Sequence, residues 1–299
     1  MSRKVHAKGV LSYLILTYGL TLTLVFLIYS TGGVYGFSAL GVYGIMLIPA
    51  FSAFIVRKFI TKEGFRGSGL CIGWKRYYII AYTLPILIVT ATYVLSIIIG
   101  YGKVYISESE LIEHLKELTK QGGVTTIPKP PMGLSYSEWF LLLSVASITA
   151  LVPLAWVFGF GEEFGWRGYL LPKLMSLGKW KALIMTGFLW WLWHTPLTLI
   201  IPSSSQLSLM ETTIIALTGL LAAILVNIMF AWLYYASGSI FTAALAHALY
   251  NQTARALAIF ISVNPIIFNV ITVITLALVI FILYKLKQID KITEQVNRT

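Results

Sequence analysis

Residues 266–284 read IIFNVITVITLALVIFILY, a run of nineteen residues in which no side chain carries a charge. A helix needs roughly 20 apolar residues to cross the hydrocarbon core of a bilayer. Inside lipid every backbone N–H and C=O must find a partner within the chain. A run of this length and composition therefore predicts a transmembrane helix.

The whole chain shares this apolar character. Of its 299 residues, 58% are hydrophobic and 11% are charged, and the mean hydropathy is +0.83. Soluble domains are typically a little under half apolar and about a quarter charged. The composition therefore excludes an ordinary soluble enzyme, a disordered chain and a nucleic-acid-binding module. The single cysteine, Cys71, excludes a disulfide framework and a cysteine-rich zinc site.

Seven further segments resemble the opening run, so the sequence predicts eight transmembrane helices. The predicted spans cover residues 9–30, 37–56, 77–99, 139–160, 182–201, 214–235, 239–262 and 266–284. The predicted fold class is all-α, a polytopic membrane protein whose residues 1–299 form a single integral-membrane domain.

The basic residues predict how the chain is oriented. Lys and Arg outnumber Asp and Glu by 22 to 11, and 17 of the 22 fall in the N-terminus, loop 57–76, segment 161–181 and the C-terminal tail. With eight spans, these four segments share one side, which the positive-inside rule assigns to the cytoplasm. The expected partner of these charges is the lipid bilayer and not nucleic acid. We expect both termini to be cytoplasmic, in a prokaryotic plasma membrane.

Residues 100–137 form the longest predicted loop, on the extracytoplasmic side. Within it, residues 107–121 (SESELIEHLKELTKQ) predict a short amphipathic helix that Ser107 caps together with Glu110. We expect the leucines of this helix to lie on the membrane surface. His114 is expected to be an ordinary polar surface residue.

Titratable side chains are nearly absent from the predicted spans. Each one is costly in hydrocarbon and is therefore a functional hypothesis. Two of the four histidines, His194 and His247, lie inside spans. Of the 11 acids, only Glu162 and Glu163 follow an apolar span directly, with no obvious loop around them.

Spacing assigns these residues to helix faces. Glu163 and Arg167 are four residues apart, so they can pair on one helical face. Glu162 points about 100° away from that face and is free to contact another group. His247 and Asn251 are also four apart and share a face.

One buried site explains these positions most economically. Taken singly, each residue has a simpler explanation: a solvated carboxylate at a helix end, a histidine bonded to a carbonyl, or polar contacts between helices worth about 0.6 kcal/mol. Three spans, however, each contribute one strong polar cluster, and burial without a partner would be costly. We therefore predict that the clusters converge on one water-filled intramembrane cavity. A carboxylate as general base, with an imidazole and an amide as oxyanion donors, provides what water needs to attack an amide bond.

The ordered motifs resemble the CPBP family of intramembrane proteases. This family is related to the type II CAAX prenyl endopeptidase (the Ras-converting enzyme) and to bacteriocin-processing and immunity proteins. The resemblance covers residues 138–260, the predicted catalytic core, and rests on three motifs: Glu162-Glu163-x-x-x-Arg167, an aromatic residue four positions before His194, and His247-x-x-x-Asn251. The family usually has Phe where this chain has Trp190, and we expect the ring to play the same role.

The resemblance implies catalytic roles for four residues. Glu162 would activate the attacking water, and His194 would help to hold it. His247 and Asn251 would form the oxyanion hole. The implied activity is that of an endopeptidase that cuts near the C-terminus of a membrane-associated peptide or a prenylated, CAAX-type protein.

Four further residues have supporting or substrate-binding roles. Glu163 and Arg167 would hold the active-site helix in place. Trp190 and Arg255 are candidates for substrate binding, Arg255 because it continues the face of His247 and could neutralise a substrate carboxylate. Snorkelling of Arg255 to the membrane interface is the alternative.

Zinc is an alternative to metal-free chemistry. Glu162, His194 and His247 are the residue types that bind catalytic zinc. We expect no cofactor, because metal-free chemistry gives Glu162 a role as base and leaves the poor zinc ligand Asn251 a role as donor.

Two other functions stay open: a membrane transporter, for which the expected inverted repeats are not visible, and a catalytically silent scaffold or immunity-like protein. The sequence predicts no oligomeric state.

Overall fold

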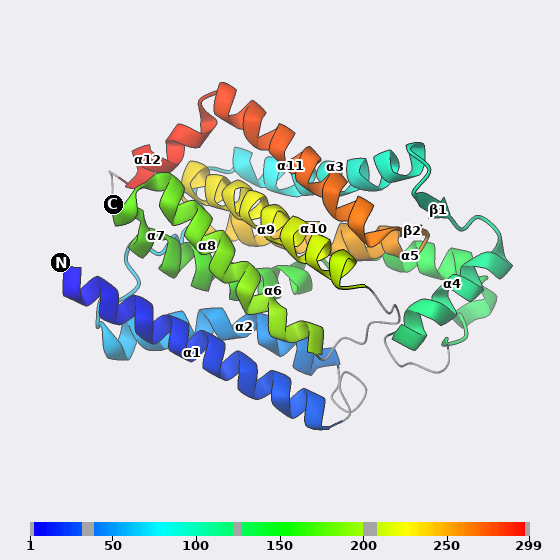
Figure 1. The fold of residues 1–299 in the computed structure, drawn as a ribbon, viewed down its shortest axis with the longest axis horizontal. Coiled ribbons are helices and arrows are strands. Elements are labelled where there is room, and N and C mark those ends of the chain that lie inside the picture. Colours follow the sequence, from blue (N-terminus) through cyan, green and yellow to red (C-terminus); the bar gives the residue numbers. More distant parts are fainter. Residues whose placement is uncertain (1–2, 32–38, 122–126, 200–207, 297–299) are drawn as a thin grey trace.

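A computed structural model describes residues 3–31, 39–121, 127–199 and 208–296. Most of the chain is helical, and the longest helices run side by side (Figure 1). The helices are α1 (Arg3–Ser30), α2 (Ala39–Ile55), α3 (Arg76–Ile98), α4 (Glu108–Gln121), α5 (Tyr136–Ile148), α6 (Val152–Gly165), α7 (Leu171–Leu174), α8 (Lys179–His194), α9 (Leu209–Ser237), α10 (Ile240–Ala258), α11 (Pro265–Lys285) and α12 (Lys291–Val296). Two short strands, β1 (Gly102–Val104) and β2 (Ile261–Val263), pair antiparallel.

The predicted all-α polytopic membrane fold is confirmed, but with fewer clear spans than eight. In the described part of the chain, α1, α2, α3, α9 and α11 are long and apolar enough to cross a membrane. The pair α5 and α6 gives a sixth candidate, bent by 52° at its break. The other two predicted spans form helices that fall short: α8 has 16 residues, and α10 interrupts its apolar run with His247, Asn251 and Arg255.

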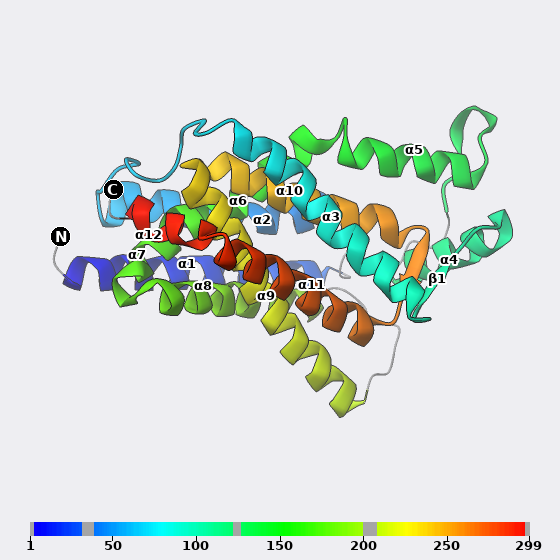
Figure 2. The same cartoon turned by 90° about the horizontal axis from the view of Figure 1, so that it is seen from above.

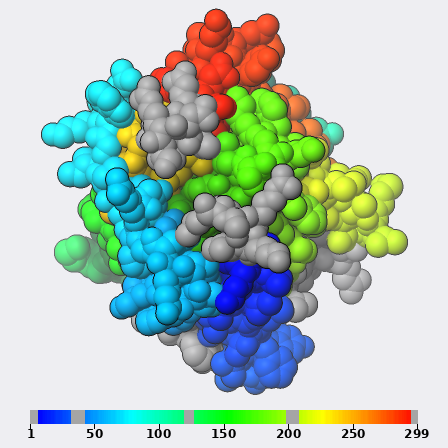
Figure 3. Space-filling model, turned by 90° about the vertical axis from the view of Figure 1, so that its left-hand side faces the viewer, coloured from blue at the N-terminus to red at the C-terminus, as the bar shows by residue number. Residues whose placement is uncertain are grey.

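The segments predicted to share the cytoplasmic side meet at one end of the molecule. Glu63, in the loop after α2, forms an ion pair with Lys173 of α7. Lys179 lies 3.2 Å from Asp290, between α11 and α12. Helix α1 begins at this end and α12 ends there (Figure 1). Figure 3 shows the loop after α2, the α7 region and the C-terminal helices gathered on this face.

The opposite end carries β1 and α4, residues 102–121, which we call the outer cap (Figure 2). The predicted amphipathic helix is present as α4, and the backbone N–H of Glu110 donates to Ser107 Oγ at 3.3 Å. The predicted surface position is wrong for Leu111 and Leu115, which are buried against the protein, whereas Leu118 is half-buried. His114 is likewise buried, so it is not a surface residue as expected.

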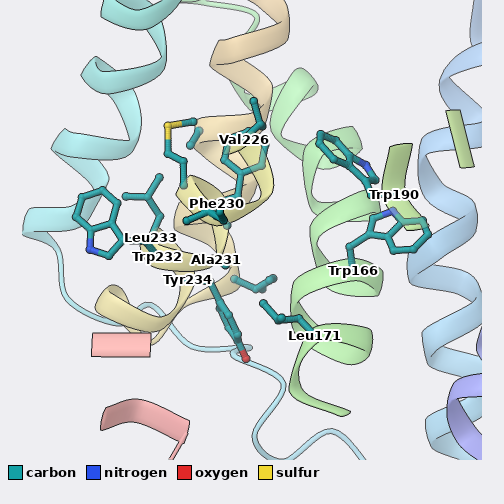
Figure 4. Packing of buried hydrophobic residues seen from close by; sticks show 14 of the residues in the cluster. Trp166, Leu171, Trp190, Val226, Phe230, Ala231, Trp232, Leu233 and Tyr234 are labelled. Carbon is teal, nitrogen blue, oxygen red and sulfur yellow. The ribbon is translucent and has the colours of Figure 1, made fainter. Parts of the chain in front are cut away.

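Helix α9 passes through the apolar core. All its side chains from Val226 to Tyr235 are buried, as expected for a helix segment packed on all sides (Figure 4). Asn227 Nδ2 donates to the Leu183 carbonyl at 2.7 Å, which joins α9 to α8.

Helix α6 lies between α2 and α10 because its glycines allow close backbone approach. A Cβ on Gly159 would lie 2.5 Å from the Ala244 carbonyl oxygen of α10, and one on Gly161 would lie 2.5 Å from the Met46 carbonyl oxygen of α2. Small residues at such contacts are typical of helices packed in membranes. They hold the end of α6, with its two carboxylates, against both neighbours.

Gly161→Ala should destabilise the protein, because the new methyl group would meet backbone that cannot move aside. Overpacking of this kind costs about 1–3 kcal/mol. The matched control is Gly44→Ala on α2, where a Cβ meets nothing within 4 Å. Thermal unfolding in detergent should show a lower midpoint for Gly161→Ala alone, and equal midpoints would contradict this packing.

Candidate active site

Helix α6 ends in two buried carboxylates, Glu162 and Glu163. The helix then widens into a π-helical turn, Trp166–Leu170, that carries Arg167. Arg167 Nη1 donates to Glu163 Oε1 at 2.7 Å, and both side chains are fully buried. The pairing expected from the four-residue spacing is therefore present, and Glu162 is left to contact other groups.

Glu162 faces both histidines of the predicted site. Its Oε1 lies 3.9 Å from His247 Nε2 on α10, and its Oε2 lies 3.9 Å from His194 Nε2 at the end of α8. The indole N–H of Trp190 donates to the same Oε2 at 2.8 Å. Helices α6, α8 and α10 thus bring together groups that are far apart in the sequence.

The second ring nitrogen of each histidine is held by an acceptor. His247 Nδ1 lies 2.8 Å from Glu163 Oε1, and His194 Nδ1 lies 2.8 Å from the Trp190 carbonyl oxygen. Carboxylate and carbonyl oxygens only accept, so both Nδ1 atoms carry the hydrogen. In a neutral ring, Nε2 then turns a lone pair toward Glu162. The Glu162 carboxylate and the two Nε2 atoms thus face one another as hydrogen-bond acceptors. A water molecule between them could donate a hydrogen bond to each of two of these acceptors.

Aromatic rings enclose this polar cluster. The Phe230 ring stacks on His247 with centroids 5.2 Å apart. The Arg167 guanidinium lies 4.6 Å from the Trp190 ring centroid and 5.3 Å from that of Phe230. The two rings also pack edge-on against each other, 6.4 Å apart (Figure 4). The buried cation is therefore held by a carboxylate and by two ring faces.

The three titratable side chains of the site differ in exposure. The His194 side chain is 39% exposed, whereas those of Glu162 and His247 are 2% and 3% exposed. Of the three, His194 is therefore the side chain that solvent reaches most readily.

Asn251 and Arg255 lie beyond this cluster on α10. They line a small pocket with Tyr43 and Phe158. Arg255 is exposed and donates to the Tyr43 hydroxyl at 2.8 Å. Among the described residues, the Asn251 side chain forms no hydrogen bond. The structure thus places both residues one to two turns from His247 on α10, and among the described residues neither side chain is hydrogen-bonded to Glu162.

The zinc alternative has suitable ligand types but lacks a close cluster. Glu162, His194 and His247 provide one carboxylate and two imidazoles, as catalytic zinc sites do. Within residues 3–31, 39–121, 127–199 and 208–296, no three His, Cys, Asp or Glu side chains are grouped so that they could hold a metal ion.

Sequence reasoning missed two contacts of this site. Phe230 gives no signal, because an apolar ring on an apolar helix has no distinctive spacing. Trp190 was assigned to substrate, yet its N–H is bonded to Glu162. A buried indole N–H needs an acceptor, and this requirement could have linked Trp190 to the nearby carboxylate.

The part of the chain that carries this cluster is similar to known proteins. Residues 143–253 match the family model described as type II CAAX prenyl endopeptidase Rce1-like. This segment is therefore similar to that family. The match confirms the family resemblance of the motifs, and it contains the cluster from Glu162 to Asn251.

A similar protein is CAAX prenyl protease 2 of Methanococcus maripaludis, 29% identical over 157 residues. The alignment covers 50% of this chain and 58% of the relative, so the similarity spans little more than half of the relative's length.

Within the Rce1-like segment, Glu163→Gln should be strongly destabilising, because it leaves the buried Arg167 cation without its counter-charge. Breaking a buried pair typically costs about 3–5 kcal/mol. The control is Glu113→Gln, whose pair with Lys116 is exposed and worth less than about 1 kcal/mol. Unfolding curves in detergent measure both losses, and similar losses would show that Glu163 does not hold this site together.

Proposed function

We propose that this chain is an intramembrane endopeptidase of the CAAX type. It hydrolyses a peptide bond near the C-terminus of a membrane-associated, prenylated protein. The observation that carries the proposal is the 3.9 Å approach of the buried Glu162 carboxylate to two imidazoles from other helices. The Rce1-like match over the same residues and the name of the archaeal relative support the reaction and the substrate class.

The acceptors around Glu162 define how water is activated. A water molecule donates one hydrogen to Glu162 and the other to His194 Nε2, which aims its oxygen at the substrate carbonyl carbon. Glu162 takes the first proton as the new C–O bond forms, and the carbonyl electrons move to oxygen. When the tetrahedral intermediate collapses, the C–N bond breaks and Glu162 returns the proton to the leaving amine. One water is consumed for each bond cut.

The oxyanion is stabilised from α10. Because His247 Nδ1–H is engaged by Glu163, Nε2 donates only when the ring carries a second proton. The negative charge of the oxyanion then offsets the imidazolium charge, because Glu163 is already paired with Arg167. The Asn251 amide, one turn along the same face, is the second donor. Loss of one such donor typically lowers kcat by about 10²–10³.

The position of the site fits a substrate anchored in the membrane. His247 is eight residues from Ser239 at the basic end of the molecule, or about 12 Å along the helix. We infer that this end faces the cytoplasm, so that a C-terminal tail enters from there. The exposed side of His194 leaves room for the peptide.

Glu162→Gln should abolish cleavage of prenylated fluorogenic peptides, with a loss of at least about 10²-fold, because the amide is not a base. The variant should fold, because its side-chain oxygen can still accept from Trp190. Glu117→Gln, on the exposed face of α4, should cleave at the wild-type rate. Mass spectrometry of the released fragment locates the bond.

Equal activity in Glu162→Gln and wild type would contradict this mechanism. A wild type that is inert toward both prenylated and unprenylated peptides would instead favour the transporter or the silent scaffold.

Metal content is a separate test of the proposed chemistry. We expect purified, active protein to contain far less than one zinc per chain and to keep its activity after dialysis against a chelator. Elemental analysis by mass spectrometry measures this directly. One zinc per chain, lost in both Glu162→Gln and His247→Ala, would instead assign Glu162 and His247 as ligands.

A further inference from the structure

The C-terminal end of α10 is held by groups from other parts of the chain. The last four carbonyls of a helix have no partner within the helix. Four donors reach the carbonyls at and just beyond this end: Tyr93 Oη bonds Ala254 at 3.2 Å, Ser144 Oγ bonds Ala256 at 3.4 Å, His114 Nε2 bonds Ala258 at 2.9 Å, and the Tyr105 N–H bonds Phe260 at 2.9 Å.

His114 is the donor that the outer cap aims into this helix end. Its side chain is buried, and Nε2 must donate because the Ala258 oxygen only accepts. The imidazole stacks on Tyr105, with centroids 4.1 Å apart and planes 14° apart. The Tyr105 hydroxyl is 2.9 Å from Ser262 Oγ of β2. The His114 ring is thus held by stacking on Tyr105 of the outer cap and by its hydrogen bond to α10.

The opposite end of α10 is also fixed. The Ile240 N–H donates to the Gly69 carbonyl at 3.0 Å, and the Phe241 N–H donates to Ser239 Oγ at 3.2 Å. Between the two ends, His247 has its own anchor in Glu163. Asn251 has no such anchor among the described residues, so its place depends on how the outer half of α10 is held.

We propose that His114 is a positioning residue for Asn251. Its bond to the Ala258 carbonyl is one of the four that hold the outer half of α10, and it is the one through which the α4 side chain sets the position of the Asn251 amide relative to the oxyanion. Ala258 is seven residues beyond Asn251, or about 10 Å along one uninterrupted helix. A shift of the helix end is therefore passed to Asn251, while the bond to Glu163 restrains His247. The catalytic part rests on the proposed function, whereas the clamp on α10 does not.

The outer cap is separate from the peptidase-like segment of the chain. Its residues 102–121 precede the Rce1-like match, which begins at residue 143. The proposal therefore gives a role in the reaction to a part of the chain that the family match does not include.

Hydrogen–deuterium exchange tests the clamp without any assay of activity. His114→Phe keeps a ring against Tyr105 but removes the donor, and His114→Leu serves as a second donor-free variant. Amides of residues 250–258 should exchange at least about tenfold faster in both, because helix-end amides open when their anchors are lost. His114→Gln, whose amide can donate to Ala258, should stay near wild type, as should the neighbouring control Glu113→Gln. Unchanged exchange in the donor-free variants overturns the clamp.

Kinetics test the catalytic part. His114→Phe should lower kcat about tenfold and leave KM unchanged, because a misplacement of about 1 Å can cost up to 10²-fold. His114→Gln should restore kcat. In an Asn251→Ala background, His114→Phe should have no further effect, since the two residues act through one step.

The same loss in both backgrounds would overturn positioning through Asn251. A wild type that cleaves no peptide would overturn the proposed function and the catalytic role of Asn251 with it. The exchange data would then still decide whether His114 holds α10.

Discussion

A single carboxylate oxygen, Glu163 Oε1, joins the buried Arg167 cation to the His247 imidazole, at 2.7 and 2.8 Å. Taking a charge out of water costs several kcal/mol unless it is paired and hydrogen-bonded. The fold meets this requirement with one contact that ties the π-helical turn after α6 to the middle of α10. The contact also decides which ring nitrogen of His247 faces Glu162, so stability and chemistry depend on the same atom.

The close approach of α6 to α2 and α10 makes this contact possible. Gly159 and Gly161 bring backbone within reach of backbone, so the end of α6 is set against both neighbours. When α6 and α10 are packed in this way, Glu162 faces the His247 imidazole of α10. Helix α8 adds His194 and the Trp190 N–H to the same site. Burial of Glu162, Glu163 and His247 strengthens each electrostatic interaction in the site.

Spacing within one helix was enough to predict the Glu163–Arg167 pair, because residues four apart are neighbours on a helix. The cost of burying polar groups singly was enough to predict that Glu162, His194 and His247 converge. Periodicity shows that a helix has an apolar face but not whether protein or lipid covers it, so the surface positions predicted for Leu111, Leu115 and His114 are wrong. Nor could composition show the bend between α5 and α6, or the early end of α8 at His194, which reduce the number of clear spans.

An electron cryomicroscopy structure of the protein in a lipid nanodisc would test directly whether Glu162, His194 and His247 share one buried water. Our account predicts the Glu162 carboxylate within about one hydrogen-bonded water of both imidazoles, below the level of the lipid headgroups and still capped by Trp190. A carboxylate that faces bulk solvent, or lies too far from the two histidines for one water to reach all three, would contradict it.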